Sequence, residues 1–171
     1  MRLRGPGIPI DPDPEFLRLP DLGPTADEGE LLDYADELCD EPCTRDVTHL
    51  AFLDRDGRQV APAGRLHGVP RLPRRAEVDD LVDMFRHQGA RVRARQLVCV
   101  WQTADDELAD RVGVDAWASG LLRPFGAGPL TLRALWHRSP NGFVVPGVLE
   151  GRTGRTARDY RRPGAASPRH H

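Results

Sequence analysis

The stretch VDDLVDMFRHQGARVRARQLVCVW, residues 78–101, decides the fold, because a helix pattern is followed in it by the pattern of a buried strand. Apolar residues first recur at the spacing of one helix face, at Val78, Leu81, Val82 and Phe85. We expect Gly89 to end this helix. Residues 97–101 are all apolar, as in a central strand that helices cover on both faces. The stretch therefore predicts an α/β protein.

Similar patterns continue toward the N-terminus. Apolar residues recur at helical spacing over residues 26–40, and Thr25 with Glu28 forms a capping box at the start of that segment. The composition of residues 47–53 predicts a strand. Residues 54–61, which begin Asp-Arg-Asp-Gly, are typical of a turn followed by a short returning segment. We therefore expect a helix and a hairpin before the central stretch.

A helix and a second hairpin follow the central stretch. We expect the helix over residues 104–122, and Gly113 is where a break in it would fall. Residues 130–136 alternate between apolar and polar side chains, as in a strand. Residues 139–142, Ser-Pro-Asn-Gly, are a strong hairpin turn, and residues 143–148 form the returning strand.

This order of helices and strands predicts one α/β domain over residues 25–150. We expect a mixed sheet of about five strands flanked by helices, in three layers of the α/β/α type. Residues 1–24 are rich in proline and predict an extended arm, while the arginine-rich residues 151–171 predict a flexible tail. Charge is uneven, since residues 1–46 contain 4 Arg and 13 acidic residues and the predicted tail contains 6 Arg and 1 acidic residue.

Composition limits the class and the source of the protein. All 24 basic residues are arginine, which together with abundant Ala, Gly and Pro indicates a GC-rich genome, such as that of a high-GC bacterium or its phage. We expect no signal peptide, because prolines and glycines follow the first residues in place of an apolar run. No stretch approaches the ~20 apolar residues of a membrane span. The 3 cysteines, an odd number, argue against a disulfide framework, so we expect a cytoplasmic protein without membrane contact.

A possible catalytic motif lies at the end of the predicted strand 47–53. There the sequence Leu-Ala-Phe-Leu-Asp54-Arg-Asp56-Gly resembles the first motif of the haloacid-dehalogenase-like phosphatases. The resemblance implies that Asp54 is the nucleophile, that Asp56 is the acid and base, and that both help to place Mg²⁺. Thr103 follows the central strand, where that family has a phosphate-binding Ser or Thr. The acidic pair that the family has after a fourth strand is missing, and a plain hairpin turn explains Asp-x-Asp-Gly equally.

Cysteine and histidine form a second candidate site, for zinc. Cys39 and Cys43 have a spacing that zinc sites use, and His49 and His67 follow them. The two histidines are not a close pair, and Cys39 at a helix end is equally a small buried apolar residue. Cys99, inside the central strand, is expected to be a packing residue.

The arginine-rich segment over residues 152–169 could contact nucleic acid, because arginine binds phosphate. It contains a single aromatic residue, Tyr160, so it lacks a platform for stacking bases. Since the catalytic motifs are incomplete while the core patterns are complete, we expect a non-catalytic binding or adaptor domain with a protein partner and no cofactor. The alternative is a Mg²⁺-dependent phosphohydrolase built on Asp54 and Asp56, so the sequence leaves open whether the protein is an enzyme.

Overall fold

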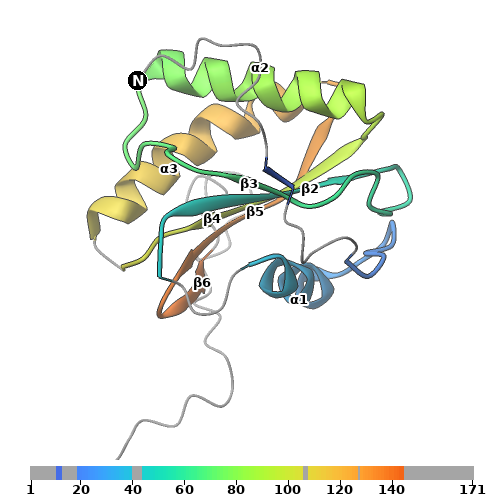
Figure 1. Ribbon diagram of the computed structural model, residues 1–171, viewed down its shortest axis with the longest axis horizontal. Helices are drawn as coiled ribbons and strands as arrows, with labels where there is room; N and C mark the ends of the chain where they lie inside the picture. The colour runs from blue at the N-terminus through green and yellow to red at the C-terminus, as the bar shows by residue number, and fades with distance from the viewer. Residues whose placement is uncertain (1–10, 13–18, 40–43, 106–107, 127, 145–171) are drawn as a thin grey trace, which may run out of the picture.

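The computed structural model describes residues 11–12, 19–39, 44–105, 108–126 and 128–144 (Figure 1). Within these residues the chain forms three α-helices, one 3-10 turn and six strands. In chain order they are β1 (Asp11–Pro12), α1 (Glu28–Leu38), β2 (Val47–Leu53), β3 (Gly64–Leu66), α2 (Arg75–Arg91), β4 (Gln96–Gln102), α3 (Leu108–Leu122), the 3-10 turn Pro124–Gly126, β5 (Thr131–Ser139) and β6 (Gly142–Val144).

The strands form one mixed sheet in the order β1-β3-β2-β4-β5-β6. Strands β4 and β5 are parallel, and all other neighbours in the sheet are antiparallel. β4 lies at the centre and pairs along its whole length with β2 and with β5. The expected mixed sheet of about five strands is confirmed. The sixth strand, β1, is a pair of residues that lies against β3.

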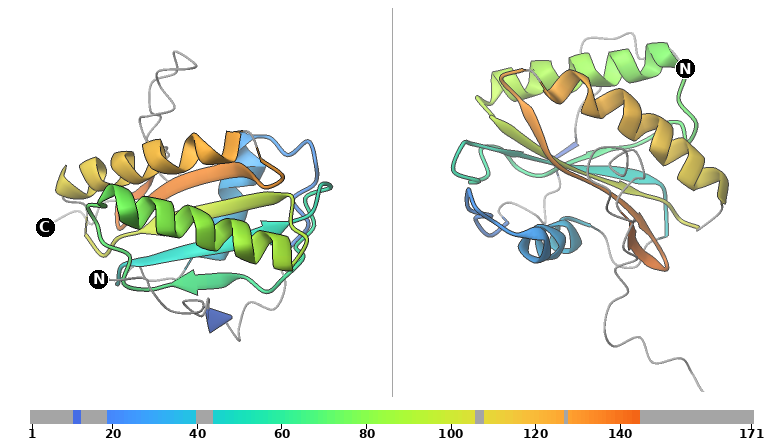
Figure 2. Two further views of the ribbon diagram at one scale, coloured as in Figure 1. Left: turned by 90° about the horizontal axis from the view of Figure 1, so that it is seen from above. Right: turned by 180° about the vertical axis from the view of Figure 1, so that it is seen from behind.

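Helices cover both faces of the sheet, which gives three layers (Figures 1 and 2). α2 and α3 lie side by side on one face, and α1 lies on the other. Alternate residues of β4 point into the two cores: Leu97, Cys99 and Trp101 pack toward α2 and α3, whereas Val98 and Val100 pack toward α1. The continuous apolar run of β4 follows from this burial on both sides.

The ends of two helices differ from the prediction. The capping box of α1 consists of Asp27 and Glu30, because Asp27 Oδ1 accepts the Glu30 amide and Glu30 Oε2 accepts the Asp27 amide, each at 2.9 Å. Asp caps a helix as well as Thr does, so the box lies two residues later than expected. α2 continues through Gly89 to Arg91. Gly89 has a packing role instead, because a Cβ there would lie 2.9 Å from a methyl group of Leu130.

The predicted helix after β4 shows no break at Gly113, which lies inside α3. An added Cβ at Gly113 would overlap the carbonyl oxygen of Arg71, and one at Gly120 would overlap Val78. Both glycines therefore allow close packing of α3, the first against the loop between β3 and α2 and the second against α2 itself.

The predicted arm and tail are described only in part. Leu19 and Leu22 are buried in the core beneath α1, so the end of the arm packs on the domain. Most of residues 1–18 and all of residues 151–171 lie outside the described residues. In the part of the chain that the structure describes, no helix is long and apolar enough to cross a membrane.

Candidate functional site

One edge of the sheet collects the buried polar side chains. Because β4 and β5 are parallel, their carboxyl ends meet at this edge, and β2, which is antiparallel to β4, begins there. Ligands of α/β proteins commonly bind at the carboxyl ends of parallel strands. Seven buried polar or charged side chains of the described residues lie here: Thr48, His49, Gln102, Thr103, His137, Arg138 and Ser139. We call this group the polar edge.

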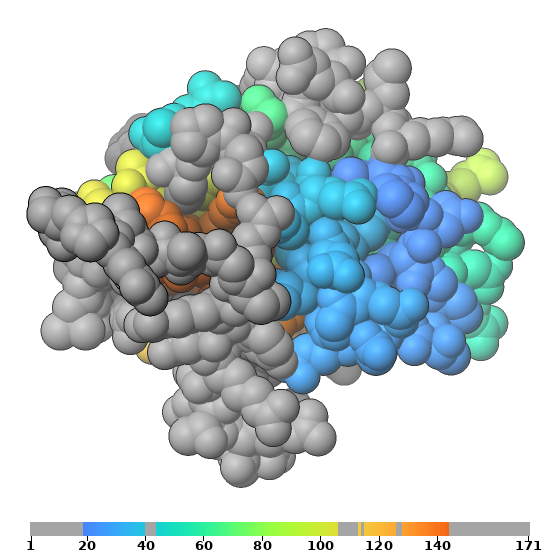
Figure 3. Space-filling view, turned by 90° about the horizontal axis from the view of Figure 1, so that it is seen from below, coloured from blue at the N-terminus to red at the C-terminus, as the bar shows by residue number. Residues whose placement is uncertain are grey.

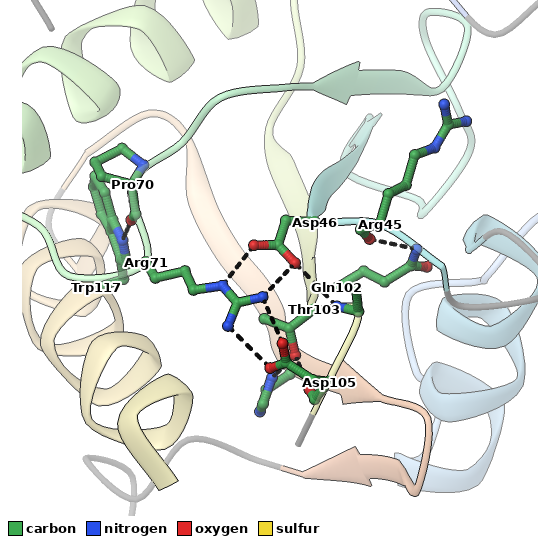
Figure 4. A network of polar contacts seen from close by, with 10 residues as sticks. Arg45, Asp46, Pro70, Arg71, Gln102, Thr103, Asp105 and Trp117 are labelled. Carbon is green, nitrogen blue, oxygen red and sulfur yellow. Dashed lines mark hydrogen bonds and ion pairs between the residues drawn. The ribbon is translucent and has the colours of Figure 1, made fainter. Parts of the chain in front are cut away.

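Arg71, in the loop between β3 and α2, holds two carboxylates beside the polar edge (Figure 4). Its Nε and Nη2 donate to Asp46 at 2.6 and 2.9 Å, and its Nη1 and Nη2 donate to Asp105 at 2.9 and 3.1 Å. Asp46 also accepts the backbone amide of Ala104 at 3.0 Å. The hydrogen bond from Arg71 holds the pKa of Asp46 below its usual value, and the Ala104 amide adds to this effect. Arg71 therefore ties its loop to the start of β2 and to the segment after β4.

Thr103 and His137 form a buried pair on the α2–α3 side. The Thr103 hydroxyl lies 2.9 Å from His137 Nε2 and 2.8 Å from the Asp105 carbonyl oxygen. A hydroxyl has one hydrogen, and a carbonyl oxygen can only accept. Both bonds form together only if Thr103 donates to Asp105 and Nε2 of His137 donates to Thr103. In that state His137 holds a proton on Nε2, so it cannot take the proton of Thr103 as a general base would.

His49 and Gln102 form a matching pair on the α1 side. His49 Nε2 lies 3.3 Å from Gln102 Oε1, and Gln102 Nε2 donates to the Arg45 carbonyl oxygen at 3.1 Å. Because the amide nitrogen of Gln102 is used by Arg45, its oxygen faces His49, whose Nε2 must then be the donor. A proton on Nε2 leaves only Nδ1 of this imidazole for a metal ion.

Arg138 links the polar edge to α1. Its Nη1 lies 3.4 Å from Asp36 Oδ1, an ion pair without hydrogen-bond geometry, and its guanidinium lies 5.1 Å from the centre of the Phe143 ring. Arg138 is buried, and the carboxylate of Asp36 and the face of Phe143 both offset the cost of burying its charge. The contact fixes α1 against β5 and β6.

Among the residues that the structure describes, those of the predicted zinc site do not lie together. Cys39 is buried at the end of α1, His49 is buried in β2, and His67 is exposed after β3. Cys43 lies outside the described residues. Among the described residues there is no group of three or more His, Cys, Asp or Glu side chains that could hold a metal ion. Cys99 is fully buried, as expected for a packing residue, and burial raises the pKa of its thiol.

The structure separates the predicted catalytic aspartates from Thr103. Asp54 follows the end of β2, whereas Thr103 follows the end of β4, and these two strands are antiparallel. The aspartates and the threonine therefore lie at opposite edges of the sheet. Asp54 Oδ1 accepts the amides of Asp56 and Arg58 at 2.8 and 2.9 Å, and Asp54 and Arg58 also pair through their backbones. This carboxylate is the closing group of a tight turn.

Two small hollows lie within the part of the chain that the structure describes. One lies between the loop after β3 and α2, and the other lies beside the start of β2, and each has room for about one water molecule. A substrate-sized pocket is much larger. The hydrogen bonds and ion pairs of the polar edge hold loops and strand ends together.

The exposed face of α1, on the side of the molecule that Figure 3 shows, is acidic. The helix sequence EGELLDYADEL contains no basic residue. We define the acidic surface as the exposed side chains of Asp27, Glu28, Glu30, Asp33 and Glu37. Asp27, Glu28 and Glu30 lie at the start of α1, where carboxylates favour the helix, whereas Glu37 lies in the last turn, where a carboxylate opposes the helix dipole. Asp33 and Glu37 are four residues apart, so their charges repel each other.

Tyr34 lies among these acids. Its side chain is 5 % exposed, and its hydroxyl has no hydrogen-bond partner among the described residues. Burial raises the pKa of Tyr34, and the nearby carboxylates of Asp21 and Glu37 raise it further. The Tyr34 hydroxyl therefore lies close to the carboxylate of Glu37, beneath the acidic surface.

Sequence reasoning missed most of these residues. Arg71 is one of many arginines, and no spacing connects it to Asp46 or Asp105, because the three residues meet only through the pairing of β2 and β4. His137 belongs to an ordinary alternating strand. The acidity of the N-terminal part was visible in the sequence, although its concentration on one helix face was not singled out as a site.

No family model matches the chain, and no curated protein or solved structure matches it.

Proposed function

We propose that the chain is a non-catalytic binding domain that takes up a basic segment of a partner protein on the acidic surface of α1. The observation that supports this proposal best is the charge of α1, which has only acidic side chains on its exposed face. Glu28, Asp33 and Glu37 have no ion pair within the described residues. A partner that supplied positive charge would relieve their mutual repulsion.

The chemistry of the surface favours arginine or lysine as the partner's contact residue. Asp33 and Glu37 are four residues apart on the helix, so their side chains are neighbours on one face. A guanidinium can bridge two such carboxylates. The Tyr34 hydroxyl is buried, so it would accept a further hydrogen bond from that guanidinium only if its ring turned outward on binding. The same carboxylates repel phosphate, which argues against nucleic acid on this face.

The contacts of the polar edge argue for a structural role of its groups. Its most promising nucleophile and base, Thr103 and His137, are both buried, and their hydrogen bonds keep a proton on His137 Nε2. Arg71, the strongest cation near this edge, is bound by two carboxylates. These groups are placed to stabilise the fold.

Binding of a short oligoarginine peptide to the full chain tests the proposal. The double variant Asp33→Asn/Glu37→Gln removes two charges from the acidic surface. The matched control, Asp79→Asn/Asp83→Asn, removes two exposed charges at the same spacing from α2, on the opposite face of the sheet. We expect the α1 variant to weaken binding about tenfold, on the order of 1.4 kcal/mol, and the α2 variant to have little effect.

Tyr34→Phe separates a specific site from general attraction. It removes only the hydroxyl, so we expect a smaller loss of affinity at unchanged net charge. Equal losses in the α1 and α2 double variants would contradict the proposal, because they would indicate attraction to the net charge of the whole protein. Calorimetry at two salt concentrations supplies both readouts.

A further inference from the structure

The loop over residues 92–95, between α2 and β4, lies at the edge of the sheet opposite the polar edge. The Arg95 amide donates to the Leu53 carbonyl oxygen at 2.8 Å, and the Arg95 carbonyl oxygen accepts the Thr131 amide at 2.9 Å. The loop therefore lies between the end of β2 and the start of β5. Figures 1 and 2 show the end of α2 at this same end of the sheet.

Arginine is the only charged residue type in this part of the sequence. Residues 84–104 contain four arginines and no acidic residue. Three of these arginines, Arg91, Arg93 and Arg95, are exposed where α2 ends and the loop leads into β4. Arg91 lies in the last turn of α2, where a cation is favoured by the helix dipole. The other two lie beyond the helix.

The turn after β2 adds a fourth exposed arginine, Arg55. Its carbonyl oxygen accepts Gln96 Nε2 at 3.2 Å, so the turn is joined to the first residue of β4, next to the loop. The two carboxylates of the turn have other partners, because Asp54 accepts backbone amides and Asp56 pairs with Arg58. We call Arg55, Arg91, Arg93 and Arg95 the basic edge. None of these four side chains has a hydrogen bond or an ion pair within the described residues.

Arg93 has a backbone conformation that glycine usually occupies. Its φ is 58°, and no other non-glycine residue of the described chain has a positive φ. Two hydrogen bonds close the end of α2 around it: the Arg93 amide donates to Ala90 at 3.2 Å, and the Ala94 amide donates to Gly89 at 2.8 Å. Glycine is the usual residue at this position of a helix end, because a side chain there strains the backbone. Arg93 therefore weakens the fold, and no polar contact within the described residues offsets the strain.

The chemistry of the basic edge fits phosphate. A guanidinium donates two parallel hydrogen bonds to phosphate oxygens. Residues 91–95 span at most about 14 Å, and duplex nucleic acid has one charge per about 1.7 Å of its axis, so several phosphates lie within reach at once. A protein partner would normally add apolar contacts. The single large apolar side chain that is exposed among the described residues, Leu72, lies at the other end of α2.

We propose that the basic edge binds the phosphate backbone of duplex nucleic acid. All aromatic side chains of the described residues are buried, so none is exposed to stack on the bases of a single strand. Contacts with phosphate alone do not depend on base sequence. The basic edge shares no residue with the acidic surface of α1, so this proposal does not depend on the function proposed above.

Titration of a short, fluorescently labelled duplex DNA with the full chain, followed by anisotropy, tests the proposal. Arg91→Gln/Arg95→Gln removes two charges from the basic edge and keeps the backbone contacts of the loop. The matched control, Arg74→Gln/Arg75→Gln, removes two exposed charges at the other end of α2. We expect the first variant to weaken binding about tenfold and to lower the slope of log affinity against log salt by about two, and the control to have little effect.

Arg93→Gly separates binding from folding. Glycine adopts the backbone angle of residue 93 without strain, so we expect this variant to unfold about 2–4 °C above the parent chain. The same substitution removes one guanidinium, so its affinity for the duplex should fall about threefold. A lower unfolding temperature with unchanged affinity would show that Arg93 serves the fold and would count against the proposal.

Three further results would overturn the proposal. The first is equal affinity for the duplex in Arg91→Gln/Arg95→Gln and the parent chain. The second is an equal loss in the α2 control, which would indicate attraction to the net charge of the whole protein. The third is binding of oligoglutamate as tight as that of the duplex at the same salt concentration, which would indicate an acidic protein segment as the partner. The arginines of residues 152–169 are the same in every variant, so they do not account for a difference between variants.

Discussion

Asp46 and Arg71 are 25 positions apart in the sequence and meet with 2.6 Å between Asp46 Oδ2 and Arg71 Nε. The contact joins the residue before β2 to the loop before α2. Asp105, from the segment after β4, joins the same guanidinium. One arginine thus connects three segments that leave or enter the sheet at a single edge.

Asp46→Asn is expected to destabilise the protein by about 1 kcal/mol at neutral pH, a modest effect because both partners are about one-third exposed and solvent screens the pair. The asparagine oxygen can still accept the Ala104 amide, so mainly the charge is lost. The pKa of Asp46 is lowered in the folded state. Its charge therefore adds to the free energy of unfolding above the pKa that an aspartate has in the unfolded chain, about 3.9. This contribution is lost as the pH falls through the lower pKa of the folded state.

Urea unfolding over a range of pH checks this prediction. The difference between the parent chain and Asp46→Asn should be largest at neutral pH and should shrink below about pH 4. Asp56→Asn is the control, because its ion pair with Arg58 is mostly exposed and should contribute little at any pH. A pH-independent difference for Asp46→Asn would show that its charge is not the stabilising feature.

Asp54 is predicted to act through its acceptor oxygen and not through its charge. Asp54→Asn keeps an oxygen that can accept the amides of Asp56 and Arg58, so the free energy of unfolding should change by less than about 0.5 kcal/mol. Asp54→Ala removes both hydrogen bonds and should cost about 1–2 kcal/mol. Chemical denaturation measures both variants. Phosphate-ester hydrolysis by the parent chain that disappears in Asp54→Asn would contradict the structural role.

The sequence patterns predicted the fold well because they are local. Each pattern depends on the burial of a single helix or strand. The apolar stripe that includes Val78 and Phe85 is the buried face of α2, and the apolar run at residues 97–101 is buried on both faces of β4. The Ser-Pro-Asn-Gly turn fixes the β5–β6 hairpin for the same reason. Gly89 and Gly113 were misjudged because glycine has two uses: it ends a helix, or it lets another segment approach closely, and only the tertiary structure distinguishes them.

The candidate sites were harder to predict, because they depend on strand direction. Asp54 and Thr103 each follow an apolar strand, so a parallel pairing of those strands would place them together. The antiparallel pairing of β2 and β4 places them at opposite edges and brings Asp46 beside the end of β4 instead. No local pattern distinguishes these two pairings.

Gly113 is predicted to be essential for the position of the loop between β3 and α2. Alanine favours a helix by about 1 kcal/mol over glycine, so Gly113→Ala would stabilise an isolated α3. In the protein the added methyl group would overlap the Arg71 carbonyl oxygen, which belongs to a backbone held by the Arg71 and Pro70 contacts. We expect a net loss of about 2 kcal/mol in the free energy of unfolding.

Gly128→Ala is the control for Gly113→Ala, because an added Cβ there would meet only ordinary contacts at 3.9 Å. Its effect should stay within about 0.5 kcal/mol. Thermal unfolding of both variants compares them directly. If Gly113→Ala were as stable as the parent chain, the loop between β3 and α2 would not be held against α3 as the structure shows.

The Thr103–His137 pair gives the last prediction. Thr103→Val keeps the shape of the side chain and removes the hydroxyl, which leaves the Nε2 hydrogen of His137 and the Asp105 carbonyl without this partner. Because the site is buried, we expect a loss of about 1–3 kcal/mol. Thr103→Ser keeps the hydroxyl and should recover most of that loss. Urea unfolding measures stability, and NMR of the His137 ring follows Nε2. If His137 Nε2 had no hydrogen at neutral pH, Thr103 would have to donate to it, and the pair would have the arrangement of a nucleophile and its base.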